Sequence, residues 1–321
     1  MQNKLLVICG PTATGKTSAA LKIAKKINGE LISADSRQVY KGMDIGTGKD
    51  IPKGAKYRSH AKFGGYYDAD GIKIWGYDLV SPKKEYSVAE YSVVVRKIIK
   101  DVWKRKKTAI IVGGTGFYIN AVVDGIDTAG IPKNESLRKS LEKLNIDELF
   151  EKLALLDSIK AASLNTSDKK NPRRLVRAIE VAQWQLTNQP EDGKGTKLIA
   201  ECSLLYVGLK ADKKELEVLI NDRVDKRMNS GMVEEVKRLL KSGVSWSDQS
   251  MNALGYKQLE AYFNKSVSMD EAVVNWKKEE LKYSKRQMTW FTKDKRIQWF
   301  FIGGKVYPEN MEKYVLKWYK E

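Results

Sequence analysis

Short apolar runs alternate with segments of helical periodicity through the first part of the chain. Lys4–Cys9 (KLLVIC), Glu30–Ala34 (ELISA) and Thr108–Val112 (TAIIV) are short and apolar, and Ser203–Leu209 (SLLYVGL) repeats the pattern further on. Such runs are typical of buried strands, whereas Lys16–Ile27 spaces its apolar residues as a helix does. The alternation predicts an α/β fold in which helices flank a parallel sheet.

The middle of the chain differs from this pattern. From about residue 124 to 200 it is charged and helical, with few strand signals. Asn171 and Pro172 are typical of a helix start, with Asn as the cap and Pro in the first turn. We therefore expect a helical insertion at 124–200 and a core of residues 1–123 and 201–321. After the insertion, apolar residues at helical spacing form a stripe that is predicted to be buried. Its members are Leu216, Leu219, Ile220, Val224, Met228, Val233, Val236 and Leu240.

Three polar loops follow the predicted strands: Gly10–Thr17 (GPTATGKT), Asp35–Gln38 (DSRQ) and Gly113–Thr115 (GGT). The carboxyl ends of parallel strands meet at one edge of a sheet, which is where such sheets bind ligands. The three loops therefore predict one composite site.

The first loop has the form G-x-x-x-x-G-K-[ST] between a strand and a helix, which is a phosphate cradle. Its backbone N–H groups and the helix N-terminus bind anionic oxygens, Lys16 adds a positive charge, and the Thr17 hydroxyl is a ligand for Mg²⁺. Which phosphate binds there stays open. The predicted phosphate-binding residues are Gly10, Pro11, Thr12, Ala13, Thr14, Gly15, Lys16 and Thr17.

A nucleotide triphosphatase or kinase is the default interpretation of this motif. It predicts a second apolar strand that ends in an acidic residue. Thr108–Val112 runs into Gly113 and Gly114 instead, and the acid follows another strand as Asp35. This arrangement suits a site that handles a phosphorylated group beside a substrate that needs a carboxylate and an amide.

The charge balance narrows the partners. Lys and Arg number 58 against 40 Asp and Glu, a formal charge of +18, which favours RNA phosphates or anionic lipid. Lipid is the weaker choice because no long apolar run or signal peptide is visible. Lys104–Lys107 is expected to be solvated surface. Cys9 and Cys202 are far apart in sequence, which suits a reducing cytoplasm.

Further segments carry a family resemblance. GPTATGKT, ELISADSRQVYKGMDIGTGK, VGGTGFY, NPRRLVRAIEV, MNALGYKQL and YSKRQMTWF follow in order from about residue 5 to residue 300. In sequence and spacing this series resembles the tRNA dimethylallyltransferase family. The resemblance implies a P-loop fold that transfers a dimethylallyl group from dimethylallyl diphosphate to N6 of an adenine beside the anticodon of tRNA.

The resemblance also implies catalytic roles. Lys16, with Gly15, Thr17 and Mg²⁺, would stabilise the departing diphosphate, and Arg223 would bind it. By similarity Asp35 is the general base, a contribution of about 10²–10⁴-fold, and Thr115 lines the channel through which the base enters. Alternatives stay open: Asp35 as a helix cap or water-mediated metal ligand, Thr115 as a helix N-cap, and Arg223 in an intrahelical ion pair.

The resemblance to this family also implies contacts with tRNA. Gln38 would read the adenine edge, because one amide can both donate and accept, whereas Trp290 and Phe291 are expected to pack. For Ser36 and Arg37 the alternative is an exposed turn. For the arginines that follow Pro172 it is a solvated basic helix. The implied tRNA-binding set is Asp35, Ser36, Arg37, Gln38, Thr115, Arg138, Asn171, Pro172, Arg173, Arg174, Leu175, Lys285, Arg286 and Gln287.

Residues 52–77 depart from the family pattern, so their fold and contacts stay open. Prenylation of tRNA by a cytoplasmic monomer, without a membrane partner, is the leading hypothesis. A prenyltransferase acting on free adenine nucleotide is a close alternative, although it would have little use for basic RNA-binding segments. A small-molecule kinase or NTPase is the third, and the missing acidic strand end argues against it.

Overall fold

The computed structural model describes residues 2–128, 130–188 and 198–321. The chain divides into two compact units. Met1–Asp124 and Leu198–Glu321 form the first, here called the core unit, and Gly125–Lys197 forms the second, here called the helical unit.

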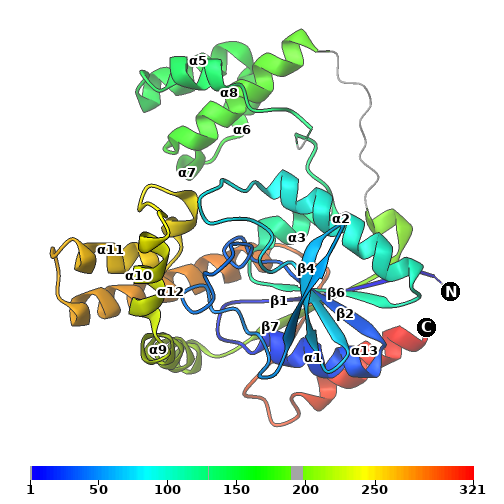
Figure 1. The fold of residues 1–321 in the computed structure, drawn as a ribbon. Coiled ribbons are helices and arrows are strands. Elements are labelled where there is room, and N and C mark those ends of the chain that lie inside the picture. Colours follow the sequence, from blue (N-terminus) through cyan, green and yellow to red (C-terminus); the bar gives the residue numbers. More distant parts are fainter. Residues whose placement is uncertain (1, 129, 189–197) are drawn as a thin grey trace. The chain divides into compact units, whose positions relative to one another are not determined.

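The core unit is built on an eight-stranded sheet with the order β3-β4-β5-β2-β6-β1-β7-β8 (Figure 1). The pairs from β5 through β8 are parallel, and β3, β4 and β5 pair antiparallel. This confirms the expected α/β fold. The strands are β1 (Lys4–Cys9), β2 (Gly29–Ser33), β3 (Lys56–His60), β4 (Gly64–Ala69), β5 (Ile72–Trp75), β6 (Thr108–Gly113), β7 (Ser203–Lys210) and β8 (Ile297–Phe301).

The divergent stretch 52–77 extends this sheet. It forms β3, β4 and β5, which run back and forth beside β2. Gly71 has a φ of 81° at the tight turn between β4 and β5, a conformation that favours glycine. The stretch is therefore part of the sheet, and its last strand leads towards the carboxyl edge.

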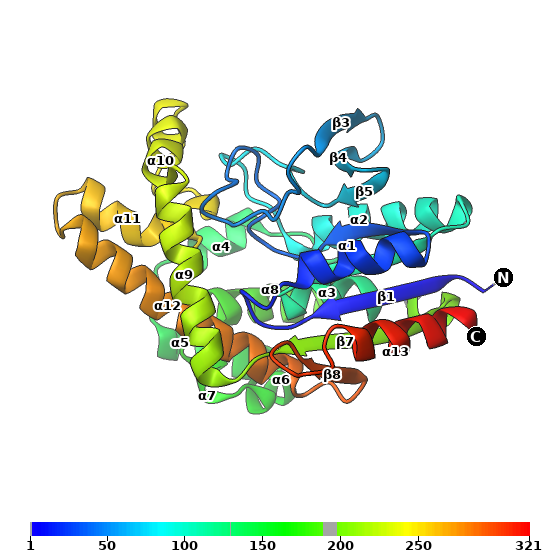
Figure 2. The same cartoon turned by 90° about the horizontal axis from the view of Figure 1, so that it is seen from below.

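Both faces of the sheet are covered, which explains the unbroken apolar runs of its strands. Leu5, Val7 and Cys9 pack in a cluster with α2 (Val88–Lys104) and α3 (Gly116–Val123). Leu6 and Ile8 point the other way and pack with α1 (Lys16–Lys26) and α13 (Glu309–Lys320). Figure 2 shows α1 and α13 alongside β1 and β7.

The predicted helical stripe spans two helices. The chain leaves the first helix at Ser230 and Gly231, where Gly231 has a φ of 97°. Leu216, Ile220 and Val224 are buried before this break, and Val236 is buried after it. The helices between β7 and β8 are α9 (Lys213–Asn229), α10 (Met232–Lys241), η2 (Gln249–Asn252), α11 (Tyr256–Phe263) and α12 (Met269–Phe291).

The basic run at 104–107 is only partly solvated surface, which corrects the expectation. The Glu30 carboxylate is fully buried at the start of β2, and Arg105 and Lys107 form ion pairs with it. Trp75 Nε1 donates to the same carboxylate over 2.9 Å. A buried carboxylate needs such partners, so two of these cations are tied to the start of β2, beside the start of β6.

The helical unit has its own small core of leucine, isoleucine and alanine side chains, including Leu149, Leu153 and Ile179. Residues 189–197 of the expected insertion lie outside the described residues. The helices are α4 (Glu135–Leu141), α5 (Ile146–Leu156), α6 (Ser158–Ser163), α7 (Thr166–Lys169) and α8 (Pro172–Thr187), and η1 (Leu198–Glu201) leads back into the core unit. Across the described ranges, no helix is long and apolar enough to cross a membrane.

Candidate functional site

A cavity of about 600 Å³ opens at the carboxyl ends of β1, β2 and β6 in the core unit. Residues from all three predicted loops line it, together with side chains of α9 and α12. The sequence-predicted residues in its lining are Thr12, Ala13, Gly15, Lys16, Thr17, Asp35, Ser36, Arg37, Gln38, Arg223, Arg286 and Gln287.

The loop after β1 has the geometry of a phosphate cradle. Gly10 has a φ of 136°, and a Cβ there would lie 2.2 Å from the Leu209 carbonyl oxygen, so only glycine fits. The Thr14 hydroxyl and Lys16 Nζ both donate to the Pro11 carbonyl, over 2.9 and 2.5 Å. Because α1 begins at Lys16, its free N–H groups face the loop.

Two cations give the cradle its charge. Burial and the nearby Arg223 guanidinium lower the pKa of Lys16 to about 8. Arg223 donates to the Thr12 hydroxyl over 2.7 Å and to the Gly48 carbonyl over 3.0 Å. Its ion pair is with Asp50, 3.5 Å away, rather than with a neighbour on its own helix. Contacts with Thr12, Gly48 and Asp50 therefore fix the orientation of the guanidinium.

Arg227 lies one turn further along α9 and is buried. Its Nη1 donates to Glu280 over 2.8 Å, and burial lowers its pKa to about 10. A Cβ at Gly48 would lie 2.2 Å from Arg227 and 2.6 Å from Arg223. Both guanidiniums thus pack closely against the Gly48 backbone, so a side chain there would displace them.

Asp35 stands at the end of β2, half-buried in the cavity wall. One carboxylate oxygen accepts the backbone N–H of Arg37 over 2.8 Å, which fixes the carboxylate in a turn of its own. It caps no helix. Arg37 itself donates to the Gln249 carbonyl over 2.9 Å. Asp35 therefore faces the cavity in a fixed orientation, together with Lys16 of the cradle.

Two predicted RNA-binding amides are engaged within the protein. Gln38 accepts the Ser33 hydroxyl over 2.8 Å and donates to the Gly48 carbonyl over 3.0 Å. Gln287 accepts the Thr12 N–H and donates to the Gly114 carbonyl, both over 2.9 Å. An RNA contact through either amide stays a prediction, and it would compete with these bonds. Both amides tie loops of the site together.

Thr115 occupies the N-cap position of α3, but its side chain makes no cap hydrogen bond. Its hydroxyl accepts the Ser36 N–H over 3.3 Å and so joins the loops after β2 and β6. Tyr283 lines the cavity beside it, and burial raises the pKa of this phenol well above its usual range. Tyr283 is therefore a neutral donor near Asp35. It opens the family-like segment YSKRQMTWF, but no role was predicted for it from the sequence.

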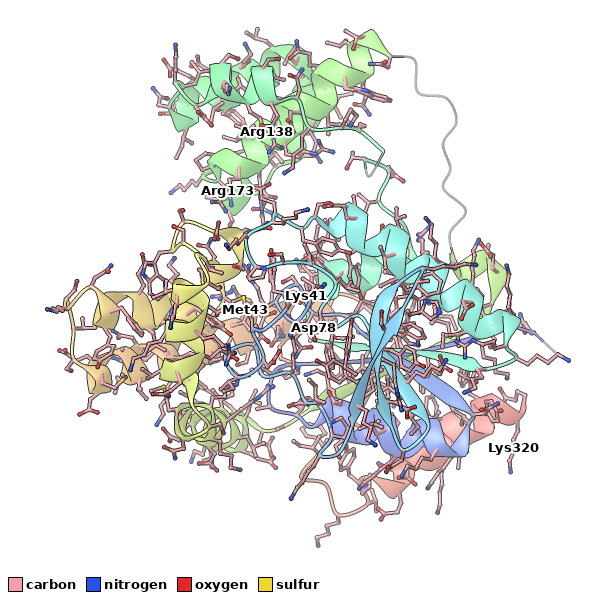
Figure 3. All side chains as sticks on the ribbon, viewed as in Figure 1. Lys41, Met43, Asp78, Arg138, Arg173 and Lys320 are labelled. Carbon is pink, nitrogen blue, oxygen red and sulfur yellow. The ribbon has the colours of Figure 1, made fainter. Side chains whose placement is uncertain are left out.

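The loop at 43–50 was also missed, although part of it lies in a family-like segment. Lys49 is buried and donates to Asp78 over 2.5 Å, to Asp44 over 2.6 Å and to the Tyr40 carbonyl over 2.7 Å. The Tyr67 hydroxyl of β4 donates to Asp78 over 2.6 Å. Figure 3 labels Asp78 beside Lys41 and Met43, where this loop meets the divergent strands.

A second anchor holds the same loop from α10. The buried Glu235 carboxylate accepts the backbone N–H groups of Asp44, Ile45 and Gly46, each over 2.9 Å. The Tyr256 hydroxyl donates to it over 2.5 Å. This cluster could not be recognised from the sequence because its members come from distant segments.

The cradle contains oxygen donors suited to Mg²⁺. The Thr17 hydroxyl lies 3.4 Å from an Asp50 carboxylate oxygen at the N-terminus of α1. Among the described residues, no three His, Cys, Asp or Glu side chains cluster as a metal site. Mg²⁺ is commonly held by one or two protein oxygens, substrate phosphates and waters, so this donor set fits it.

The cationic residues of α12 lie next to the cavity. Lys285 and Arg286 are exposed, and the Arg286 guanidinium lies 5.7 Å from the Tyr283 ring centre. Trp290 is 43% exposed, so it is not simply packed as expected, whereas Phe291 is 3% exposed and packs in the core. Of these accessible side chains, only Arg286 lines the cavity.

In the helical unit, Asn171 caps α8 by accepting the Arg174 N–H, and Pro172 is the first residue of the helix, as predicted. Arg173 is exposed, and Arg174 pairs with Asp168. Leu175 is fully buried, so its side chain supports the unit and cannot touch RNA directly. Figure 3 shows Arg173 on this unit.

Arg138 forms a two-pronged ion pair with Glu180, over 2.6 and 2.7 Å. Burial opposes ionisation of Glu180, but hydrogen bonds from Arg138, the Asn134 backbone and Arg177 outweigh it and lower the pKa of Glu180 to about 2. Arg138 and Arg177 therefore serve the stability of the helical unit. An RNA contact through Arg138 stays a prediction.

The mostly parallel sheet, the glycine-rich loop and the cation-lined cavity define an α/β protein with a P-loop sequence, whose cavity also contains a carboxylate. Comparison with known proteins specifies it further. The chain belongs to the IPP transferase family, whose profile matches residues 38–294. A profile described as isopentenyl transferase matches residues 3–60.

Individual proteins of this family are similar to the chain over nearly its whole length. A tRNA dimethylallyltransferase of Carboxydothermus hydrogenoformans is 39% identical over 322 residues, covering 98% of this chain and 95% of that protein. One of Anoxybacillus flavithermus is 38% identical, covering 94% of this chain and 91% of that protein. The structure of a tRNA isopentenylpyrophosphate transferase of Bacillus halodurans matches with a TM-score of 0.68 at 31% identity, covering 99% of this chain and 97% of that one. A eukaryotic dimethylallyltransferase acting on tRNA shares the fold, with a TM-score of 0.77 at 21% identity, covering 98% of this chain and 78% of that one.

Proposed function

We propose that this protein transfers the dimethylallyl group of dimethylallyl diphosphate to N6 of an adenine next to the anticodon of tRNA, and releases diphosphate. One observation carries the proposal. A single cavity brings the phosphate cradle, with Lys16 and Arg223, to the same space as the Asp35 carboxylate. A leaving-group site and a proton acceptor are what substitution at an allylic carbon by an amine requires.

The cradle acts on the leaving group. As the C1–O bond breaks, negative charge grows on the diphosphate, and the N–H groups at the start of α1, Lys16 and Arg223 stabilise it. Mg²⁺, when bound by Thr17, supplies further charge neutralisation of the departing oxygens. Because the pKa of Lys16 is about 8, its ammonium form predominates at neutral pH.

Asp35 acts on the nucleophile. Adenine N6 is a weak nucleophile because its lone pair is delocalised into the ring, so attack requires removal of a proton. Asp35 accepts that proton, and its hydrogen bond from the Arg37 N–H holds it in place. A general base of this kind contributes about 10²–10⁴-fold. Tyr283 lines the cavity beside it and helps to exclude water from the allylic centre, whereas Thr115 holds the neighbouring loop through the Ser36 N–H and is not part of the lining.

The tRNA acceptor is supported by the names of the relatives, by the charge of +18 and by the exposed cations Lys285, Arg286 and Arg173. A base of the anticodon loop is unpaired, so swinging it out of its stack costs only a few kcal/mol. We further propose a monomer acting in the cytoplasm. Cys9 and Cys202 are free thiols, which suits a reducing compartment.

The test is incubation of the protein with dimethylallyl diphosphate, Mg²⁺ and unmodified tRNA, followed by mass spectrometry of the nucleosides. We expect N6-dimethylallyladenosine, and a rate of its formation at least about 100-fold lower in a parallel reaction with Asp35→Ala. A product formed on free AMP but never on tRNA would refute the assigned acceptor. Release of inorganic phosphate from ATP, with no prenylated base, would refute the chemistry.

A further inference from the structure

The loop at 43–50 places a carboxylate, that of Asp50, beside the proposed phosphate site, where a negative charge is unexpected. Asp50 is exposed, yet its oxygens lie 3.4 Å from the Thr17 hydroxyl and 3.5 Å from Arg223. Both partners belong to the proposed diphosphate site. An acidic side chain beside a bound polyanion repels it, unless a cation lies between the two.

We propose that Asp50 is the acidic partner of Thr17 in holding Mg²⁺, and that it takes the place of the carboxylate that P-loop ATPases carry at the end of a neighbouring strand. In this protein that strand, β6, ends at Gly113 and is followed by Gly114. The carboxylate comes instead from the loop that follows β2. The inference rests on the Mg²⁺–diphosphate site proposed above.

The distances fit this role. In an octahedron of Mg²⁺–oxygen bonds, adjacent ligand oxygens lie about 3 Å apart. The Thr17 and Asp50 oxygens are 3.4 Å apart, a separation suited to sharing one small cation directly or through one of its waters. Arg223 at 3.5 Å keeps the carboxylate turned towards the cradle.

The backbone of Asp50 is also held in place. Its neighbour Lys49 is buried on three oxygen acceptors, and the Ile51 N–H donates to the Lys49 carbonyl over 2.8 Å. Glu235 binds three N–H groups a few residues earlier. Anchors on both sides fix the loop, so the carboxylate is positioned before any ligand arrives, as a metal site requires.

The alternative is that Asp50 only orients Arg223. The two roles differ in sign. If Asp50 holds the metal, Asp50→Asn removes a repulsive charge, so diphosphate binds equally well or more tightly without metal, while the gain from metal shrinks. If Asp50 only orients Arg223, diphosphate binding weakens equally with and without metal.

The experiment uses inorganic pyrophosphate and Mn²⁺ as probes, with no prenyl donor or tRNA. Mn²⁺ affinity is measured by electron paramagnetic resonance in the presence of pyrophosphate, and pyrophosphate affinity by calorimetry with and without Mn²⁺. Asp70→Asn is the matched control: the same change of charge at a residue 91% exposed, in the turn between β4 and β5. Thr17→Ala is the positive control.

We expect Asp50→Asn to weaken Mn²⁺ binding by about 10–100-fold without weakening metal-free pyrophosphate binding, and Asp70→Asn to match the parent. Retained metal-free binding shows that the variant is folded. Equal Mn²⁺ affinity in parent and Asp50→Asn, or a loss of pyrophosphate affinity independent of metal, overturns this inference alone. Absence of any Mn²⁺ effect in the parent and in Thr17→Ala would overturn the proposed metal site itself, and with it this inference.

Discussion

Replacing Glu235 by glutamine tests how the loop at 43–50 is held in place. The carboxylate has four donors. One oxygen accepts the N–H groups of Asp44 and Ile45, and the other accepts the Gly46 N–H and the Tyr256 hydroxyl. The side chain is 1% exposed, so water cannot replace any lost partner.

The magnitude follows from this geometry. A glutamine amide must place its NH₂ group against one of the two donor pairs. Facing Asp44 and Ile45 it loses two hydrogen bonds, and facing Gly46 it loses that one, since the Tyr256 hydroxyl can turn to accept. Each is worth about 1.5–3 kcal/mol, so we expect the free energy of unfolding of the core unit to fall by about 1.5–6 kcal/mol. Tyr256→Phe removes one donor and leaves three, and should cost about 1–3 kcal/mol.

The assay is urea unfolding followed by tryptophan fluorescence, with pyrophosphate affinity as a second measurement. If the loop detaches before the core unit unfolds, the cost appears as weaker pyrophosphate binding, because the Gly48 carbonyl then no longer positions Arg223. Glu235→Gln with parental stability and parental pyrophosphate affinity would refute the reasoning. So would a larger effect of Tyr256→Phe than of Glu235→Gln.

Three further predictions concern the chemistry and the RNA. Asp35→Asn should lower prenyl transfer by about 10²–10⁴-fold and leave pyrophosphate binding intact; single-turnover rates near those of the parent would contradict its role. Since the pKa of Lys16 is about 8, raising the pH through that value removes its positive charge and should weaken pyrophosphate binding, and calorimetry near pH 8 should show proton uptake on binding, because the anion favours the charged amine. A flat affinity from pH 7 to about 9 would refute this. Arg173→Glu should weaken tRNA binding and lower its salt dependence by about one counterion, whereas Lys320→Glu, the same charge change on α13 in the core unit, should do so far less; equal effects would assign the change to net charge alone.

Much of the fold could be predicted because the information is local. A buried parallel strand such as Lys4–Cys9 needs apolar side chains on both faces, so its sequence already states its environment. The phosphate cradle is equally local: eight consecutive residues supply the backbone turn, the cation and the hydroxyl. The Asn171 cap needs only its own helix.

Other features depended on distant segments. The break at Gly231 could not be predicted from the apolar stripe, because one glycine is compatible with a continuous helix. Only the packing of α9 and α10 shows that the chain turns there. Arg105 was expected to be solvated because its neighbours in sequence are basic. Its partner Glu30 is brought to it by the pairing of β2 with β6.

The sequence by itself therefore determined the strand and helix pattern and the phosphate cradle, since each rests on neighbours along the chain, whereas the role of Asp35 as a candidate base was implied by the family resemblance. Only the tertiary structure decided which side chains reach the cavity and which hold it. Gln287 could not be recognised as a link between the loops after β1 and β6, nor Asp50 as a neighbour of Thr17, because hydrogen bonds and ion pairs act across a few ångströms of space and not along the sequence.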